Sequence, residues 1–82
     1  MFEVYYYIDK MPHRYDYVFS TLFGATYKAC SIFEEHGFPV DIMDNTTGEI
    51  LVIIEPNNLY IAPTVNKIEL SGRIDKLFSE NP

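Results

Sequence analysis

The side chains best suited to chemistry are one cysteine, two histidines and twelve carboxylates, and their spacing joins none of them into a convincing catalytic set. Cys30 and His36, with Asp41 as an orienting acid, have the composition of a nucleophilic triad. However, Cys30 and His36 point to different sides of one predicted helix, and Cys30 adjoins the apolar stripe of that helix. Because cysteine is one of the most frequently buried residue types, we predict that Cys30 packs in the core. The sequence therefore favours a protein that is not an enzyme.

The sequence also predicts neither a metal site nor a cofactor site. His13 falls in a predicted loop, away from Cys30 and His36, so these side chains do not converge as metal ligands must. The four glycines are scattered along the chain and form no glycine-rich phosphate loop.

The negative charge is concentrated in the middle of the chain. The net charge is −6, and the stretch from Ala29 to Asn66 contains no Lys or Arg. Its acidic residues are Glu34, Glu35, Asp41, Asp44, Glu49 and Glu55. This distribution argues against direct binding of a nucleic-acid backbone and favours a basic protein partner.

Glu34 and Glu35 stand in the last turn of the predicted helix, where the helix dipole disfavours anions. One interpretation is that both side chains simply lie in solvent at the end of the helix, since the free-energy cost of an anion there is small. The other is that all six acidic residues form one acidic face that imitates a phosphate backbone. Such a face would occupy the basic groove of a nucleic-acid-binding protein.

Tyr5 and Tyr7 form a second candidate surface. Phe2, Val4, Tyr6 and Ile8 alternate with them in a predicted strand from Met1 to Asp9, so the two tyrosines face outward. Exposed tyrosines contact protein partners or stack on single-stranded bases, although strand propensity alone also explains them. Base stacking normally comes with a positive groove, so a tyrosine-faced nucleic-acid binder ranks third among the functional hypotheses.

The first half of the chain predicts a hairpin followed by a helix. Lys10 to Arg14 suits a loop, and Tyr15 to Phe19 resumes the alternation as a second strand. The expected pairs are Ile8 with Tyr15, Tyr6 with Tyr17, and Val4 with Phe19. A helix then runs from about Thr21 to His36, with Ser20 or Thr21 as its cap and Gly37 as its left-handed stop.

The second half predicts another hairpin. Phe38 to Met43 alternates as a third strand, and Asn45 to Gly48 has the chemistry of a type I turn with a glycine bulge. That turn places Ile42 opposite Val52 and Val40 opposite Ile54. A short fifth strand is expected from Leu59 to Ala62.

The fourth strand, Glu49 to Glu55, is apolar on both faces, which predicts a central position in the sheet with both faces covered. A helical segment from Gly72 to Phe78 is a candidate for the second cover. A symmetry mate is the alternative, and the residues of the homodimer that it implies are Met43, Leu51 and Ile53.

The fold expected from these elements is α+β, an antiparallel sheet of four to five strands with one main helix, in the order strand, strand, helix, strand, strand, and a short C-terminal helical segment. With 82 residues the chain predicts a single domain, residues 1–82. One cysteine excludes an internal disulfide, and no apolar run reaches the roughly 18 residues of a membrane span. We expect a cytoplasmic protein with no membrane association.

Several short motifs resemble those of small acidic bacteriophage and prophage proteins. They are Phe19-Ser20-Thr21 entering the helix, Ala25 and Ala29 within it, Gly37-Phe38-Pro39-Val40 leaving it, and Thr47-Gly48-Glu49-Ile50 closing the last hairpin. The resemblance covers Phe2 to Ile54. It implies an inhibitor of a host factor or defence protein, of the anti-CRISPR type, in the cytoplasm of a bacterial host.

Overall fold

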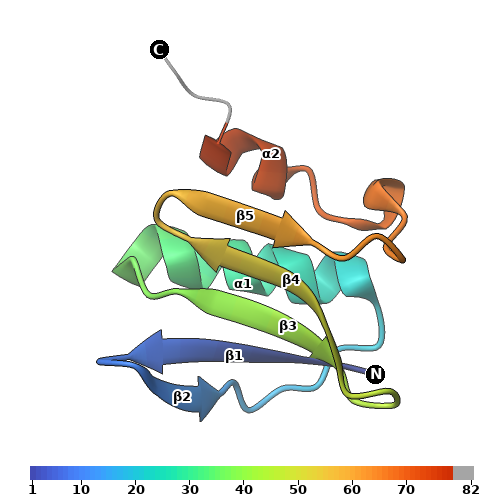
Figure 1. The fold of residues 1–82 in the computed structure, drawn as a ribbon, viewed down its shortest axis with the longest axis horizontal. Coiled ribbons are helices and arrows are strands. Elements are labelled where there is room, and N and C mark those ends of the chain that lie inside the picture. Colours follow the sequence, from blue (N-terminus) through green and yellow to red (C-terminus); the bar gives the residue numbers. More distant parts are fainter. Residues whose placement is uncertain (79–82) are drawn as a thin grey trace.

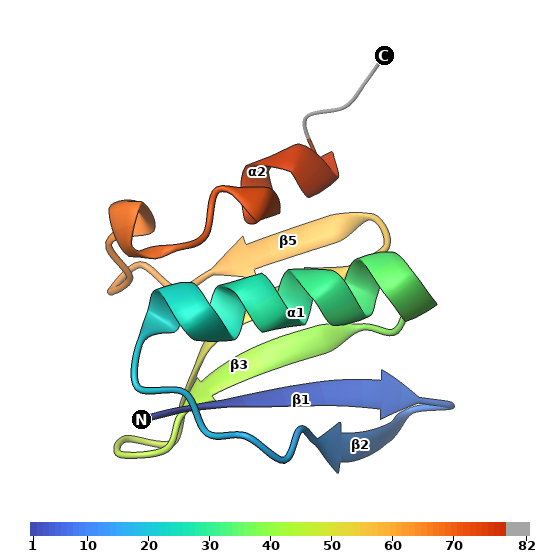
Figure 2. The same cartoon turned by 180° about the vertical axis from the view of Figure 1, so that it is seen from behind.

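The computed structural model describes residues 1–78 and has two layers, a five-stranded antiparallel sheet and a long helix lying across one of its faces (Figures 1 and 2). The elements in chain order are β1 (Phe2–Ile8), β2 (Met11–Arg14), α1 (Leu22–His36), β3 (Val40–Asp44), β4 (Glu49–Glu55), β5 (Asn58–Ile61), the 3₁₀ turn η1 (Lys67–Glu69) and α2 (Arg73–Phe78). The strand order is β2-β1-β3-β4-β5. The predicted α+β class is confirmed.

Both ends of α1 follow the capping chemistry of the sequence. Thr21 is the N-cap, and its hydroxyl oxygen accepts a hydrogen bond of 3.0 Å from the Gly24 amide. Gly37 adopts the left-handed conformation at φ 74° and donates its N–H to the Phe33 carbonyl. The predicted helix is therefore confirmed at its start and at its end.

The core lies between α1 and the sheet. Val4, Ile42, Val52 and Ile54 of the inner strands are fully buried with the small residues of α1, among them Cys30. Burial raises the pKa of the Cys30 thiol to about 11, so the side chain is a neutral packing group. The predicted core role of Cys30 is confirmed.

The β3–β4 hairpin has the predicted pairs, Ile42 opposite Val52 and Val40 opposite Ile54, and Gly48 closes its turn at φ 78°. One detail differs. Met43 pairs with Ile50, which leaves Leu51 as the extra residue of a β-bulge. Leu51 is only 7% exposed and belongs to the core cluster, so the prediction that Leu51 lies on the outer face is wrong.

The second strand is not where the sequence pattern predicts it. Asp9 and Lys10, at φ 51° and 70°, form a tight turn that places Met11 directly opposite Ile8. Tyr15 and Phe19 do bond to β1, but to Val4 and Phe2 respectively. Tyr15 and Phe19 are four residues apart, whereas their partners Val4 and Phe2 are only two apart. The segment between Tyr15 and Phe19 therefore bulges away from β1 and cannot pair with it as a regular strand.

Pro12 lies inside β2, the strand at the edge of the sheet, although the sequence suggested a loop there. The N–H of Tyr7, which faces Pro12, bonds to the Pro39 carbonyl on the β3 side. Pro12 therefore occupies a pair without hydrogen bonds, and its missing N–H would have pointed out of the sheet. The edge position explains why this proline is tolerated.

The C-terminal segment packs beside α1, not on the opposite face of the sheet (Figure 2). The guanidinium of Arg73 donates hydrogen bonds to Ser31 and Glu34 of α1 and lies 4.6 Å from the ring centre of Tyr27. The prediction that this segment covers the second face is therefore wrong. In the described part of the chain, nothing lies over that face.

Candidate functional site

The uncovered side of the sheet, which Figure 1 views from the front, has no structural partner among the described residues. Side chains alternate along a strand, so the neighbours of the buried Val4 and Ile42 point to the side away from α1, and cross-strand pairing places Ile50, Ile53 and Tyr60 on the same side. We call this surface the open face. Its members are Glu3, Tyr5, Tyr7, Arg14, Asp41, Met43, Ile50, Ile53, Glu55 and Tyr60.

The centre of the open face is apolar and aromatic. Cross-strand pairing aligns Tyr5, Asp41, Ile53 and Tyr60 in one row across four strands. Tyr60 is 43% exposed, Tyr5 and Ile53 are partly buried, and Asp41 is buried. A contiguous surface of this composition is typical of protein interaction sites.

Glu3 accepts two side-chain hydrogen bonds at the end of the open face near the β3–β4 turn. The hydroxyl of Tyr5 donates to Glu3 Oε1 over 2.9 Å, and the amide of Asn45 donates to Oε2 over 3.3 Å. These hydrogen bonds lower the pKa of Glu3, while the bond to Glu3 raises the pKa of Tyr5. Glu3 is thus held as a carboxylate at the rim of the apolar centre.

Asp41 is the most unusual residue of the open face. Only 8% of it is exposed, and its Oδ2 accepts a hydrogen bond of 2.7 Å from the Tyr7 hydroxyl. Its Oδ1 is buried and has no hydrogen-bond partner among the described residues, and no described Lys or Arg forms an ion pair with it. Burial raises the pKa of Asp41, and the hydrogen bond to Asp41 is the largest of the effects that raise the pKa of Tyr7 to about 12.

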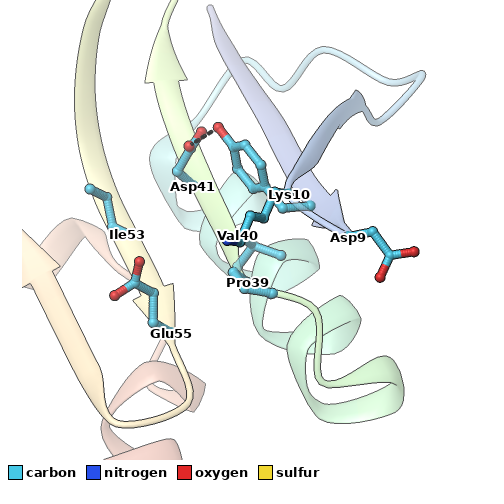
Figure 3. Close-up of a pocket in the computed structure, with 8 residues that line it drawn as sticks. Asp9, Lys10, Pro39, Val40, Asp41, Ile53 and Glu55 are labelled. Carbon is cyan, nitrogen blue, oxygen red and sulfur yellow. Dashed lines mark hydrogen bonds between the residues drawn. The ribbon is translucent and has the colours of Figure 1, made fainter.

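A pocket of about 420 Å³ opens beside Asp41, where β1, β3 and β4 lie side by side (Figure 3). Tyr7, Pro39, Val40 and Ile53 supply its apolar walls. Its charged lining residues are Asp9, Lys10, Asp41 and Glu55. In Figure 3 Asp9 points away from Asp41 and Glu55, so the remaining charged groups of the lining are these last two carboxylates and Lys10.

The structure does not bring the six predicted acidic residues onto one surface. Glu34 forms an ion pair with Arg73, and Glu35 lies beside His36 at 3.9 Å. Both belong to the C-terminal end of α1, while Asp44 and Glu49 flank the β3–β4 turn at the opposite end of the molecule (Figure 1).

Several of these carboxylates have local structural roles. Arg73 compensates the unfavourable position of Glu34 in the last helical turn. Asp44 accepts a hydrogen bond from the Thr46 amide in the turn, and Glu49 accepts one from Thr64. Of the acidic set, only Asp41 and Glu55 join the predicted Tyr5 and Tyr7 at the open face.

Two of the three residues predicted for a homodimer, Met43 and Ile53, also lie on the open face. Because of the bulge, Ile50 occupies the position on the open face that was predicted for the third residue, Leu51. Sequence reasoning missed Ile50 and Tyr60. The alternation in the predicted fifth strand could have revealed Tyr60, but no signal in the sequence revealed the bulge.

The residues considered for catalysis are not brought together. Cys30 is buried in the core between α1 and the sheet, whereas Asp41 lies on the other side of the sheet. His36 stacks on Phe38 at the surface. His13 stacks on Tyr6. Among residues 1–78, no three His, Cys, Asp or Glu side chains are close enough together to hold a metal ion.

No family model matches the chain. No curated protein and no solved structure matches it either. None of the helices in the described part is both long enough and apolar enough to span a membrane.

Proposed function

We propose that this protein is a non-enzymatic protein-binding module that docks on its partner with the open face. One observation carries the proposal: an apolar and aromatic sheet surface remains uncovered after every described element has packed. A strand that is apolar on both faces is normally covered on both faces, whereas the two layers of this domain cover only one. The uncovered face therefore has the composition of a surface that is completed by another molecule.

The charge around this face supports a basic partner. Glu3, Asp41 and Glu55 lie on it or at its rim, together with the cations Arg14, which pairs with Tyr5, and Lys10, which lines the pocket. With a net charge of −6, the chain attracts basic proteins at long range. A nucleic-acid-binding host or defence protein, as the resemblance to phage inhibitors implies, has the matching surface.

Affinity capture with matched variants tests this proposal. The chain is used as bait against an extract of a bacterial phage host, as wild type, as Ile53→Thr and Tyr60→Thr on the open face, and as Ile68→Thr. Ile68 is 85% exposed and lies on η1, away from the open face, so it controls for loss of any exposed apolar group. The proposal predicts a protein retained by wild type and Ile68→Thr and lost by both open-face variants, with all four baits folded by circular dichroism. Equal retention by all four baits contradicts it.

The apolar trio Met43, Ile50 and Ile53 favours a second candidate, a homodimer formed face to face. Sedimentation velocity over a hundredfold range of concentration distinguishes it. A concentration-dependent dimer that Ile53→Thr dissociates supports the homodimer, whereas a monomer throughout leaves the open face to a different protein.

A further inference from the structure

Asp41 is buried as a carboxylate without the partners that such a group requires. An ionised side chain removed from water is unfavourable unless it is paired and hydrogen-bonded. Tyr7 satisfies Oδ2, but Oδ1 has no donor in the described part of the chain. A cationic group beside Asp41 would compensate the charge of this poorly solvated carboxylate.

The pocket beside Asp41 has the lining of a site for a long side chain with a charged end. Pro39, Ile53 and the ring of Tyr7 line it with apolar surface, which suits a methylene stem. Glu55, on the strand next to Asp41, adds a second carboxylate to the lining. Lys10 is the one cation among the lining residues, and it is not ion-paired with Asp41.

We infer that this pocket receives a lysine or arginine side chain of the bound partner, whose cationic group pairs with Asp41. The inference rests on the proposed function, because it names the chemistry by which the open face anchors its partner. Asp41 is itself a lining residue of the pocket, so a cationic group seated there lies beside its carboxylate. Charged donors to a carboxylate form the stronger class of hydrogen bonds, which makes such an anchor specific.

The alternatives for this pocket are a neutral apolar group and an anion. An anion would meet Asp41 and Glu55 and is disfavoured by both. A neutral apolar group would fill the walls but would leave Asp41 Oδ1 unpaired, which is the unfavourable contact that the cation removes.

The test uses small probes, so that it does not depend on knowing the partner. The ¹⁵N-labelled protein is titrated with Nα-acetyl-lysine methylamide, Nα-acetyl-arginine methylamide, and the norleucine and glutamate analogues as neutral and anionic controls. Compounds of this size bind with Kd values of about 1–10 mM at best. We expect saturable amide shifts at Tyr7, Asp41 and Glu55 with at least one cationic probe, and at least about tenfold weaker effects with both controls.

Two variants complete the design. Asp41→Asn keeps the shape of the side chain and is expected to weaken the cationic probe about tenfold. Asp16→Asn removes the same charge from an exposed loop outside the open face and is expected to leave binding unchanged.

Equal shifts with the norleucine probe, no saturable shifts with either cationic probe, or no effect of Asp41→Asn would each overturn the inference. The proposed function would survive these results if the capture experiment still depended on Ile53 and Tyr60. Loss of that dependence, with specific probe binding intact, would instead reject the proposed function alone.

Discussion

The hydroxyl of Tyr7 and the carboxylate of Asp41, 34 residues apart in the chain, are joined by a hydrogen bond of 2.7 Å that ties β1 to β3 on the uncovered side of the sheet. Without this bond both oxygens of a nearly buried carboxylate would lack a donor from the described residues.

The first prediction concerns pH. Burial raises the pKa of Asp41 in the folded state above its unfolded value, so the native protein holds this proton more tightly than the unfolded chain does. The stabilising contribution of Asp41 is then complete below its unfolded pKa and is lost as the pH rises through its folded pKa. Relative to wild type, Asp41→Asn should therefore be more stable near pH 7 than near pH 3. Urea unfolding at the two pH values measures this difference, with Asp16→Asn as the control, and an unchanged difference would contradict the burial argument.

The second prediction concerns Tyr7. Tyr7→Phe removes the donor to Oδ2 and should lower the free energy of unfolding by about 1–2 kcal/mol, since a hydrogen bond to a charged group is lost at a half-buried site. It should also raise the pKa of Asp41 further, because the Tyr7 hydrogen bond lowers that pKa. NMR titration of the Asp41 carboxyl carbon checks the direction. Tyr17→Phe, at an exposed tyrosine in the segment after β2, should change neither quantity.

The third prediction tests the end of α1. Gly37 has φ 74°, a conformation that costs an L-residue about 1–2 kcal/mol, so Gly37→Ala should destabilise the protein by about that amount. Gly72→Ala is the matched control, since the added methyl group meets no atom within 4 Å and no positive φ opposes it. A similar loss in both variants would contradict the assignment of the loss to the left-handed conformation of Gly37.

The fourth prediction tests the docking of α2. Arg73→Met removes the bonds to Ser31 and Glu34 and the cation over Tyr27 while keeping most of the stem. Amide hydrogen exchange should accelerate in residues 73–77 and remain slow in β3 and β4. Lys76→Met, which removes the same charge from the same helix, should leave exchange as in wild type.

Local chemistry made much of this fold predictable. Thr21 and Gly37 set the ends of α1, and the turn at Gly48 sets the first pairs of the hairpin, because each acts through its own backbone conformation. The second strand was mispredicted for a tertiary reason. Pro12 breaks most strands, and only its place on an edge, with the nitrogen turned outward, makes it acceptable in β2.

The open face was only partly predictable for a similar reason. Period-two alternation places Tyr5, Tyr7, Met43 and Ile53 on one side, and the structure agrees. The bulge at Leu51 shifts the register by one residue, and no turn residue in the sequence marks it. The pairing of Glu34 with Arg73 depends on how the C-terminal segment folds back, which spacing along the chain does not encode.

Pro12 also opposes the pairing of further chains with the β2 edge of the sheet. A strand edge is where sheets recruit further chains and where fibril growth commonly starts. At β2 an added strand would find one backbone donor missing in the middle of a four-residue edge. The β2 edge therefore opposes the addition of further strands. The protein can expose its apolar open face without also offering the β2 edge as a template for aggregation.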